Sequence, residues 1–270
     1  MRILYCGDVV GRSGREAVLS RLPELRRSLA LDCVVVNGEN AAHGFGITAK
    51  MCEEFYAAGA DALTLGNHSW DQKEIIGYID SDPKLLRPLN LPKGTPGRGM
   101  TLIEAGRGRK LLLVQLMGRL YMDAIDDPFA KLDEVLERHR LKVGAQAILI
   151  DIHAEASSEK MSIAHFADGR VSAVIGSHSH IPTADAQILP GGTAYQTDAG
   201  MCGDYDSVIG MVKATAVARF TRKMPGDKLA PAEGPGTLCA VLVETDDASG
   251  LATSIQPIRL GGRLKDCMPG

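Results

Sequence analysis

Short apolar runs rich in Val, Ile and Leu alternate with longer amphipathic segments through the first two thirds of the chain. Such runs are typical of strands buried on both faces, and the segments between several of them have helical spacing. The expected strands are residues 3–6, 33–36, 62–65, 111–116, 147–152 and 171–175; the expected helices are residues 14–29, 48–58 with Thr48 as N-cap, 128–142 and 157–166. This alternation predicts a layered α/β fold with helices on the sheet faces.

The pattern changes after residue 191, where Gly-rich turns separate shorter segments. Residues 193–197, 238–244 and 254–258 are typical of strands, and residues 212–220 fit a helix or a strand. A second, partly antiparallel sheet would accommodate them. Residues 223–236 are rich in Pro and Gly and lack apolar periodicity, so we expect disorder there.

Composition restricts the class of protein. A chain of 270 residues that is 45% hydrophobic fits a single domain spanning residues 1–270. A formal charge of −3 predicts no stable nucleic-acid complex but is compatible with a small anionic substrate. No apolar run approaches the roughly 20 residues that span a bilayer, and Gly7 and Asp8 interrupt the first one too soon for a signal peptide. We expect a cytoplasmic protein without a membrane partner.

Metal-competent side chains follow five of the expected strands. The carboxyl ends of strands in an open α/β sheet share one edge, so these side chains are expected to converge there. The candidate ligands, in chain order, are Asp8, Glu39, Asn40, Asn67, His153, His178 and His180. His178 and His180 would share a face on a strand, and could also converge at a turn after one.

Each of these residues also has an ordinary structural explanation. Asp8 could cap the following helix, Glu39 could be a loop residue, and Asn67 could occupy a left-handed turn. A single histidine such as His153 is more often a hydrogen-bonded structural residue than a ligand. These explanations would have to hold at all five strand ends at once, which favours a metal site.

The kinds of ligand restrict the metal. Carboxylate, amide oxygen and imidazole without thiolate suit iron, manganese or zinc in a hydrolytic site. Seven ligands exceed what one ion usually takes from a protein, so two ions bridged by a carboxylate are expected. Two ions about 3.5–4 Å apart can polarise a phosphoryl group and convert a bridging water to hydroxide. The sequence therefore indicates a metal-dependent phosphoesterase.

His68 follows Asn67 directly and is the candidate catalytic residue. Held at the rim of the site, it could protonate a leaving alkoxide, which contributes about 10² to 10⁴ in rate. Asp71 could orient this imidazole, but the helix expected at residues 72–79 favours a capping role instead. His43 could touch substrate or be a solvated loop residue. No GxSxG motif surrounds Ser69, Ser177 or Ser179, which disfavours a serine nucleophile.

Six segments of the chain resemble the motifs of the YmdB-like family of calcineurin-type metallophosphoesterases. They are GDVVGRSGR (residues 7–15), NGENAAHGFGIT (37–48), TLGNHSWD (64–71), DIHAEASSEK (151–160), GSHSHIPTAD (176–185) and YQTDAGMCG (195–203). The usual DxH box departs from the superfamily pattern here, because Val10 cannot bind metal. Glu39 stands where a bridging aspartate is usual, and this branch shares both departures.

The resemblance implies a four-layer α/β/β/α sandwich with a dinuclear, iron-containing centre, manganese or zinc being alternatives. It places Asp8, Glu39, Asn40 and His180 on one metal, and Asn67, His153, His178 and the bridging Glu39 on the other, with His68 as proton donor. It implies hydrolysis of 2′,3′-cyclic nucleotides to 3′-nucleotides, with other small phosphodiesters as further substrates.

Two alternatives keep the same metal site. One is a phosphomonoesterase such as a nucleotidase, and the other is a regulatory protein that senses a nucleotide without hydrolysing it. The retained His68 argues against pure sensing. We also expect a homo-oligomer, since the apolar C-terminal strands could seal a subunit interface as well as the core.

Overall fold

The computed structural model describes residues 1–222 and 226–269 and contains two six-stranded sheets. In spatial order, the strands of the first sheet are β14 (Ala252–Leu260), β13 (Leu238–Thr245), β1 (Arg2–Cys6), β2 (Cys33–Asn37), β3 (Ala62–Thr64) and β4 (Leu85–Leu86). Of these, β1, β2, β3 and β4 are parallel, and β13 and β14 extend the sheet antiparallel beyond β1.

The second sheet has a parallel centre with one antiparallel strand at each edge. In spatial order its strands are β11 (Gln187–Ile188), β12 (Ala194–Gln196), β10 (Ala173–Ser177), β9 (Ala147–His153), β6 (Arg109–Met117) and β5 (Met100–Ala105). A small ladder of β7 (Arg140–Leu141) and β8 (Gly144–Ala145) stands apart from both sheets.

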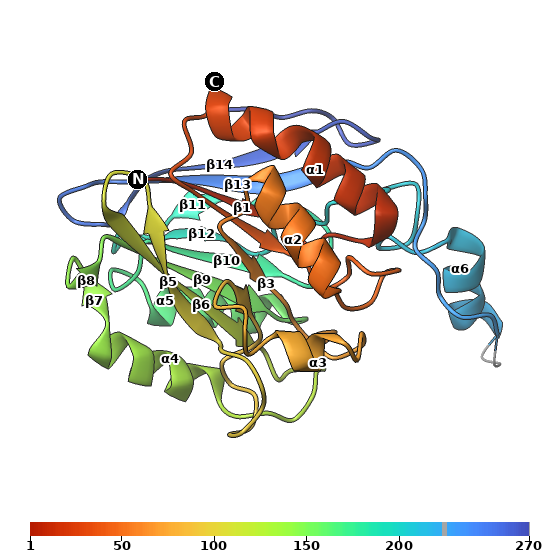
Figure 1. Cartoon of the computed structure of the whole chain (residues 1–270), viewed down its shortest axis with the longest axis horizontal. Coiled ribbons are helices and arrows are strands. Elements are labelled where there is room, and N and C mark those ends of the chain that lie inside the picture. Colours follow the sequence, from red (N-terminus) through yellow and green to blue (C-terminus); the bar gives the residue numbers. More distant parts are fainter. Residues whose placement is uncertain (223–225, 270) are drawn as a thin grey trace.

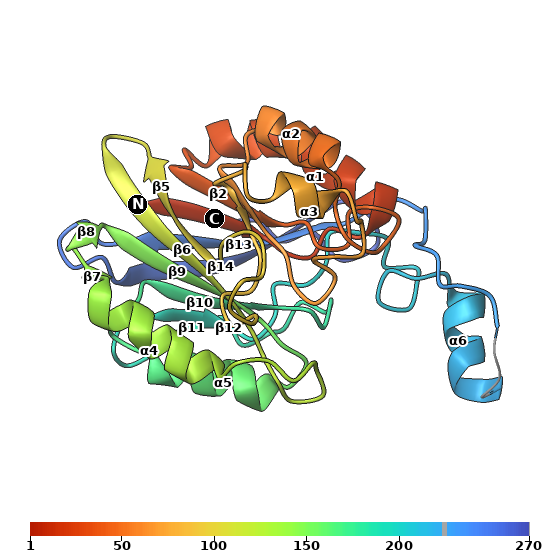
Figure 2. The ribbon, with the colours of Figure 1, turned by 60° about the horizontal axis from the view of Figure 1, so that its bottom comes forward.

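Helices cover the outer face of each sheet, and the two sheets pack face to face (Figures 1 and 2). The first sheet is covered by α1 (Gly11–Ser28), α2 (Ala49–Ala58) and α3 (Ile75–Tyr78), and the second by α4 (Pro128–Arg138) and α5 (Ser157–Phe166). Along β1, Leu4 and Cys6 face the helices while Ile3 and Tyr5 face the other sheet. This two-residue alternation builds three apolar layers, so the four-layer α/β/β/α sandwich is confirmed.

The structure corrects several expected boundaries. Residues 139–142 do not continue α4, because His139 has extended backbone angles and the β7–β8 ladder follows it. The expected helix over residues 72–79 shortens to α3. The C-terminal strands do not form a sheet of their own: β12 pairs with β10 in the second sheet, whereas β13 pairs with β1 in the first.

The segment that fitted either a helix or a strand is a helix, α6 (Lys213–Arg222), which projects from the sandwich (Figures 1 and 2). The disorder expected over residues 223–236 falls partly outside the described residues, at 223–225. The prediction is wrong for residues 230–236, because the Ser13 hydroxyl donates to the carbonyls of Ala232 and Gly234, and the Gly234 N–H donates to Asp204. None of the described helices is long and apolar enough to cross a membrane.

Candidate metal centre

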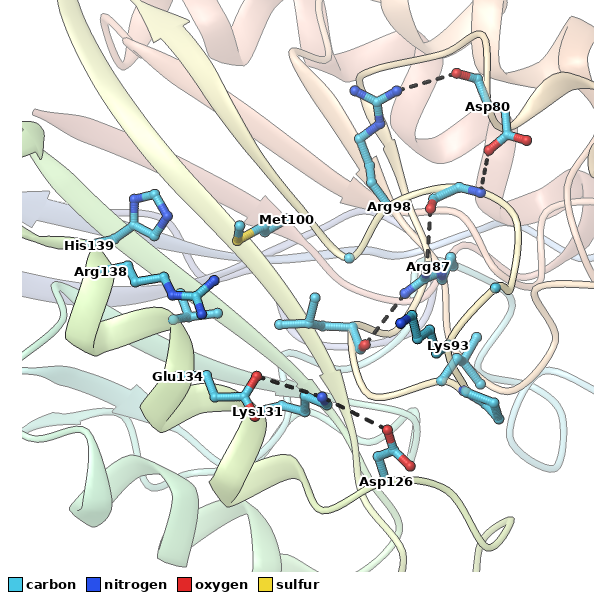
Figure 3. A pocket seen from close by; sticks show the side chains of 17 residues that line it. Asp80, Arg87, Lys93, Arg98, Met100, Asp126, Lys131, Glu134, Arg138 and His139 are labelled. Carbon is cyan, nitrogen blue, oxygen red and sulfur yellow. Dashed lines mark hydrogen bonds and ion pairs between the residues drawn. The ribbon is translucent and has the colours of Figure 1, made fainter.

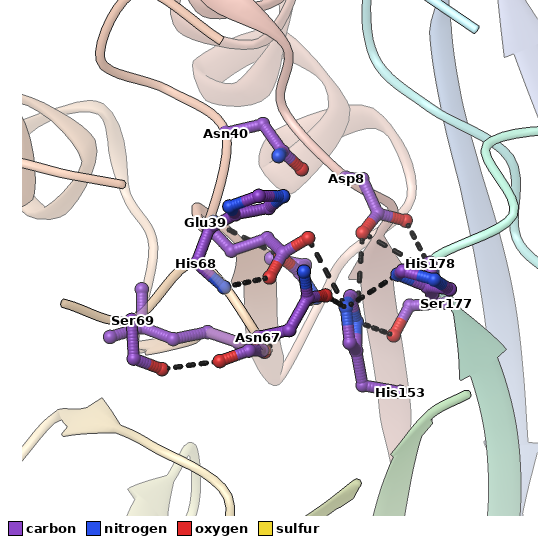
Figure 4. A network of polar contacts seen from close by, with 12 residues as sticks. Asp8, Glu39, Asn40, Asn67, His68, Ser69, His153, Ser177 and His178 are labelled. Carbon is purple, nitrogen blue, oxygen red and sulfur yellow. Dashed lines mark hydrogen bonds and ion pairs between the residues drawn. The ribbon is translucent and has the colours of Figure 1, made fainter. Parts of the chain in front are cut away.

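The predicted ligands gather where the carboxyl ends of the two central sheets meet (Figure 4). The first sheet delivers the residues that follow β1, β2 and β3, and the second delivers those of β9 and β10. The expectation of one shared edge is therefore modified, since two stacked sheets contribute. Two groups of donor atoms form there, Glu39 with His153 and His178, and Asp8 with Glu39 and His180. Glu39 belongs to both.

Donor atoms of the first group, together with the side-chain oxygen of Asn67, lie close to Nε2 of His153. Nε2 of His153 lies 2.9 Å from Oδ1 of Asn67, 3.1 Å from Nδ1 of His178 and 3.2 Å from Oε1 of Glu39. Atoms that ligate one metal at about 2.1 Å lie about 3.0–3.4 Å from each other. The spacing therefore fits a set of ligands around one ion.

Buried side-chain oxygens of Glu39 and the neighbouring Asn40 lie beside the second group. Oδ1 of Asn40 accepts no hydrogen bond from the described residues, although Asn40 is only 2% exposed, and Oε1 of the equally buried Glu39 has no described partner beyond its 3.2 Å approach to Nε2 of His153. An unpaired buried oxygen is costly unless something else satisfies it, and a cation would do so. A side chain at Gly66 would collide with the Glu39 carboxylate and the His153 imidazole, so glycine keeps the space between them open.

Each of the three imidazoles is held through the nitrogen that points away from the centre. Nδ1 of His153 contacts the Ser177 hydroxyl at 2.9 Å, and that hydroxyl donates to Asp151. Nε2 of His178 lies 3.2 Å from Oε2 of Glu155. Nδ1 of His180 donates to the carbonyl of Ile209 at 2.8 Å. Metal-binding histidines are typically oriented in this way, so the donor set fits a metal pair.

The HxH segment is a turn after β10 rather than part of the strand. His178 and His180 both have positive φ, of 91° and 64°, which is costly for residues with a side chain. Asp198 holds this turn by accepting hydrogen bonds from the N–H and hydroxyl of Ser179. Lys160 donates to the same carboxylate at 2.8 Å, and both side chains are buried. A buried ion pair thus fixes the backbone that presents the two imidazoles.

Burial and mutual charge shift the pKa values of these groups. Burial raises the pKa of Asp8 to about 6. Burial also opposes ionisation of Glu39, but its contact with His153 outweighs this and lowers the pKa of Glu39 to about 2. Burial disfavours the charged form of His153, yet Glu39 and Asp8 raise its pKa to about 9. Burial and the charge of His153 lower the pKa of His178 to about 3. The carboxylates of Glu39 and Asp8 therefore favour the positively charged form of His153, and that charge disfavours a second one on His178.

The ordinary structural roles considered for Asp8 and Asn67, and a nucleophilic role for Ser177, do not fit the observed contacts. Asp8 does not cap α1, whose N-cap is Val10, but accepts from the backbone N–H of His178. Asn67 does not have positive φ. Val10 itself is buried in an apolar cluster with Met201 and Met211. The Ser177 hydroxyl is buried between Asp151 and His153, which accounts for it without nucleophilic chemistry.

His68 lies at the rim of the centre, with its side chain 27% exposed. Its Nδ1 contacts the carboxylate of Asp71 at 2.8 Å, and its ring packs edge-on against Phe45. Asp71 therefore orients the imidazole, and the preference for a helix-capping role was wrong because α3 begins only at Ile75. The backbone N–H of His68 donates to Oε2 of Glu39, which ties the rim to the centre.

A cavity of about 310 Å³ opens over the centre. Its polar side includes Glu39, Asn40, His68, His178 and His180, and its apolar side is formed by Phe45, Ile209, Met211 and Leu229. His43 is exposed and is not among the lining residues. Glu155, which also lines this cavity, was missed in the sequence, although it lies two residues after His153 in a segment that supports the resemblance.

A larger cavity, of about 660 Å³, lies between α4 and residues 87–100 (Figure 3). Lys131 lies near Asp126 and Glu134, and the Arg87 guanidinium donates to backbone carbonyls. This cavity contains none of the predicted site residues and no candidate ligand group among the described residues. The smaller cavity, rather than the larger, adjoins the candidate ligands.

A four-layer α/β/β/α sandwich with this donor set at its strand ends defines a metal-dependent phosphoester hydrolase of the metallophosphoesterase type. The chain belongs to the YmdB-like family, whose model, described as "YmdB-like protein", matches residues 4–258. The family resemblance stated from the motifs is therefore confirmed.

Relatives and solved structures agree with this assignment. A Bacillus subtilis (strain 168) protein named 2′,3′-cyclic-nucleotide 2′-phosphodiesterase is 46% identical over 258 residues, 96% of each chain. A crystal structure of a hypothetical protein from Thermus thermophilus matches with a TM-score of 0.90 and 44% identity, over 96% of this chain and 99% of that one. A crystal structure of a novel phosphatase from Mycoplasma pneumoniae matches with a TM-score of 0.89 and 30% identity, over 96% and 93%.

Proposed function

We propose that the protein is a dimetal phosphodiesterase that hydrolyses 2′,3′-cyclic nucleotides to 3′-nucleotides. The observation that carries the proposal is the pair of donor groups joined by Glu39, because a shared carboxylate is what a bridged pair of ions requires. The name of the Bacillus subtilis relative supports the cyclic-nucleotide substrate.

In this proposal Asp8, Glu39, Asn40 and His180 hold one ion, and Asn67, His153, His178 and Glu39 hold the other. Two such ions polarise phosphoryl oxygens and supply hydroxide at neutral pH. Iron is the metal we propose, with manganese and zinc as alternatives, since oxygen and imidazole donors suit all three.

His68 acts as the proton donor. Asp71 holds Nδ1, so Nε2 is the ring nitrogen left to donate into the cavity. Water adds to phosphorus and releases a proton to solvent, the bond from phosphorus to the 2′-oxygen breaks, and His68 supplies the proton that this oxygen takes as it leaves. The 3′-phosphate remains on the ribose.

The apolar side of the cavity fits the other half of such a substrate. Phe45 comes from the Gly-rich loop after Asn40, Ile209 and Met211 precede α6, and Leu229 follows it. A flat nucleobase could lie against these side chains while the phosphate faces the centre. The projecting segment around α6 thus completes the cavity.

We further propose that residues 1–270 act as one domain in a cytoplasmic homo-oligomer. Val217 and Phe220 of α6 are 49% and 81% exposed, which supports burial in a subunit interface. The formal charge of −3 supports small substrates rather than long nucleic acids.

The decisive experiment is metal reconstitution followed by assay on 2′,3′-cyclic AMP, with identification of the product. The proposal expects 3′-AMP and about two ions per chain by elemental analysis. Faster hydrolysis of p-nitrophenyl phosphate than of bis-p-nitrophenyl phosphate would favour a phosphomonoesterase. Tight nucleotide binding without turnover on any of the three metals would favour a sensor.

A further inference from the structure

Glu155 places a carboxylate at the mouth of the candidate cavity. It lies in the short connection between β9 and α5, and its side chain is 52% exposed while its Oε2 lies 3.2 Å from Nε2 of His178. It differs in this from Glu39, which lines the same cavity but is buried in the centre. Glu155 therefore keeps a solvent-facing negative charge where substrate enters.

The basic side chains that line this cavity with Glu155 are histidines. None of the described lining residues is Lys or Arg, and Lys160, which lies behind Ser179, is buried and paired with Asp198. Sites that bind phosphomonoesters commonly use Arg or Lys to hold the additional negative charge of the phosphate. In this cavity the exposed charged side chain is the carboxylate of Glu155.

We propose that Glu155 determines specificity by excluding dianionic phosphomonoesters and admitting monoanionic phosphodiesters. A monoester carries close to two negative charges at neutral pH, because its second pKa is about 6, whereas a diester carries one. The carboxylate repels the additional charge, because the two like charges would lie close together in the cavity. This inference rests on the proposed function and names the substrate class of the same site.

Glu155 could instead serve only to orient His178, and a charge-neutral variant separates the two roles. Glu155→Gln keeps an oxygen that accepts from Nε2 of His178 but removes the charge. An orienting role predicts equal losses on both substrates, because metal binding would suffer equally for each. The specificity role predicts a change in the ratio of the two rates, and partial metal loss cancels in that ratio.

The experiment compares kcat/KM for bis-p-nitrophenyl phosphate and p-nitrophenyl phosphate in metal-loaded protein. In Glu155→Gln we expect the monoester-to-diester ratio to rise at least about fivefold over wild type. Glu155→Asp should retain the wild-type preference, because it retains the charge. Glu24→Gln, an exposed position on α1, is the matched control for net charge and should not move the ratio. Salt should weaken discrimination in wild type more than in the Gln variant.

A binding measurement makes the proposal testable without turnover. Calorimetry with inorganic phosphate at pH 8 should show tighter binding to Glu155→Gln by about the same factor, while dimethyl phosphate should bind the two proteins similarly. A ratio and a phosphate affinity both within twofold of wild type would overturn the role of Glu155. Absence of diesterase activity in wild type would instead overturn the proposed function.

Discussion

The carboxylate of Asp71 contacts Nδ1 of His68 at 2.8 Å and fixes which face of the imidazole reaches the cavity. A proton donor is useful only when its N–H points at the leaving oxygen, so this contact adds orientation to the proposed chemistry. The pair is half-exposed, with side-chain exposures of 27% and 42%, which leaves room for substrate at the rim.

Replacing His68 should affect poor leaving groups most. His68→Gln is expected to lower kcat on 2′,3′-cyclic AMP about 10²- to 10⁴-fold, because an alkoxide must be protonated as it leaves. The loss on bis-p-nitrophenyl phosphate should be much smaller, since p-nitrophenolate leaves without a proton. Asp71→Asn should fall between wild type and His68→Gln. His165→Gln, exposed on α5, is the control; equal losses on both substrates would contradict the assignment.

The Ser177 hydroxyl should control metal affinity rather than chemistry. Ser177→Ala removes the group that links Nδ1 of His153 to Asp151, and loss of such a contact typically weakens metal binding about 10- to 100-fold. Competition with a chelator, read by elemental analysis, would measure this. Ser162→Ala on α5, whose hydroxyl donates only to the Ser158 carbonyl, is the control. A lost activity that added metal cannot restore would point to a nucleophilic serine instead.

The buried pair of Lys160 and Asp198 should matter for stability. Lys160→Met leaves a buried carboxylate without its cation, which is expected to cost about 3–5 kcal/mol of unfolding free energy. Lys213→Met removes the exposed partner of Asp206 and should lower stability far less than Lys160→Met does. Urea unfolding of the two variants measures the contrast. Similar small losses in both would show that Lys160 does not stabilise the turn at His178.

Asp185 should contribute to stability in a defined pH range. Burial raises the pKa of Asp185, but hydrogen bonds from Thr183 and Thr197 outweigh it and lower the pKa below its ordinary value of 3.8. A lowered folded-state pKa stabilises the protein above 3.8, and the contribution is lost as pH falls through the folded value. Wild type should therefore exceed Asp185→Asn in urea stability at pH 6, and the difference should shrink below pH 3.8. The exposed Asp123→Asn should show no such trend.

Much of the site could be predicted because its ligands follow strands that are recognisable in the sequence. All seven predicted ligands and His68 lie at the described centre, although their roles as ligands and proton donor stay predictions. Likewise, the single-domain organisation and the oligomer stay predictions. Helix α5 has the predicted bounds, and Thr48 caps α2 by accepting from the N–H of Met51.

Other features depend on contacts between distant segments. The capping role predicted for Asp71 is wrong, because α3 begins too late for Asp71 to cap it, and only the tertiary structure shows where α3 begins. The position of Glu155 in the cavity could not be predicted from the sequence, because a carboxylate shortly before a helix is common and only the tertiary structure shows the cavity that it lines. The helix α6 was ambiguous because it projects from the sandwich and buries only Ala216.

The sequence by itself determined the layered fold and the set of candidate ligands, because strand periodicity and strand-end placement are local properties of the chain. Tertiary structure decided how those groups meet. It determines which nitrogen of each imidazole faces the centre and how the Lys160–Asp198 pair holds the turn at His178. It also places the Glu155 carboxylate beside His178 at the cavity. These are long-range contacts, and no local pattern specifies the distance between two segments that only folding brings together.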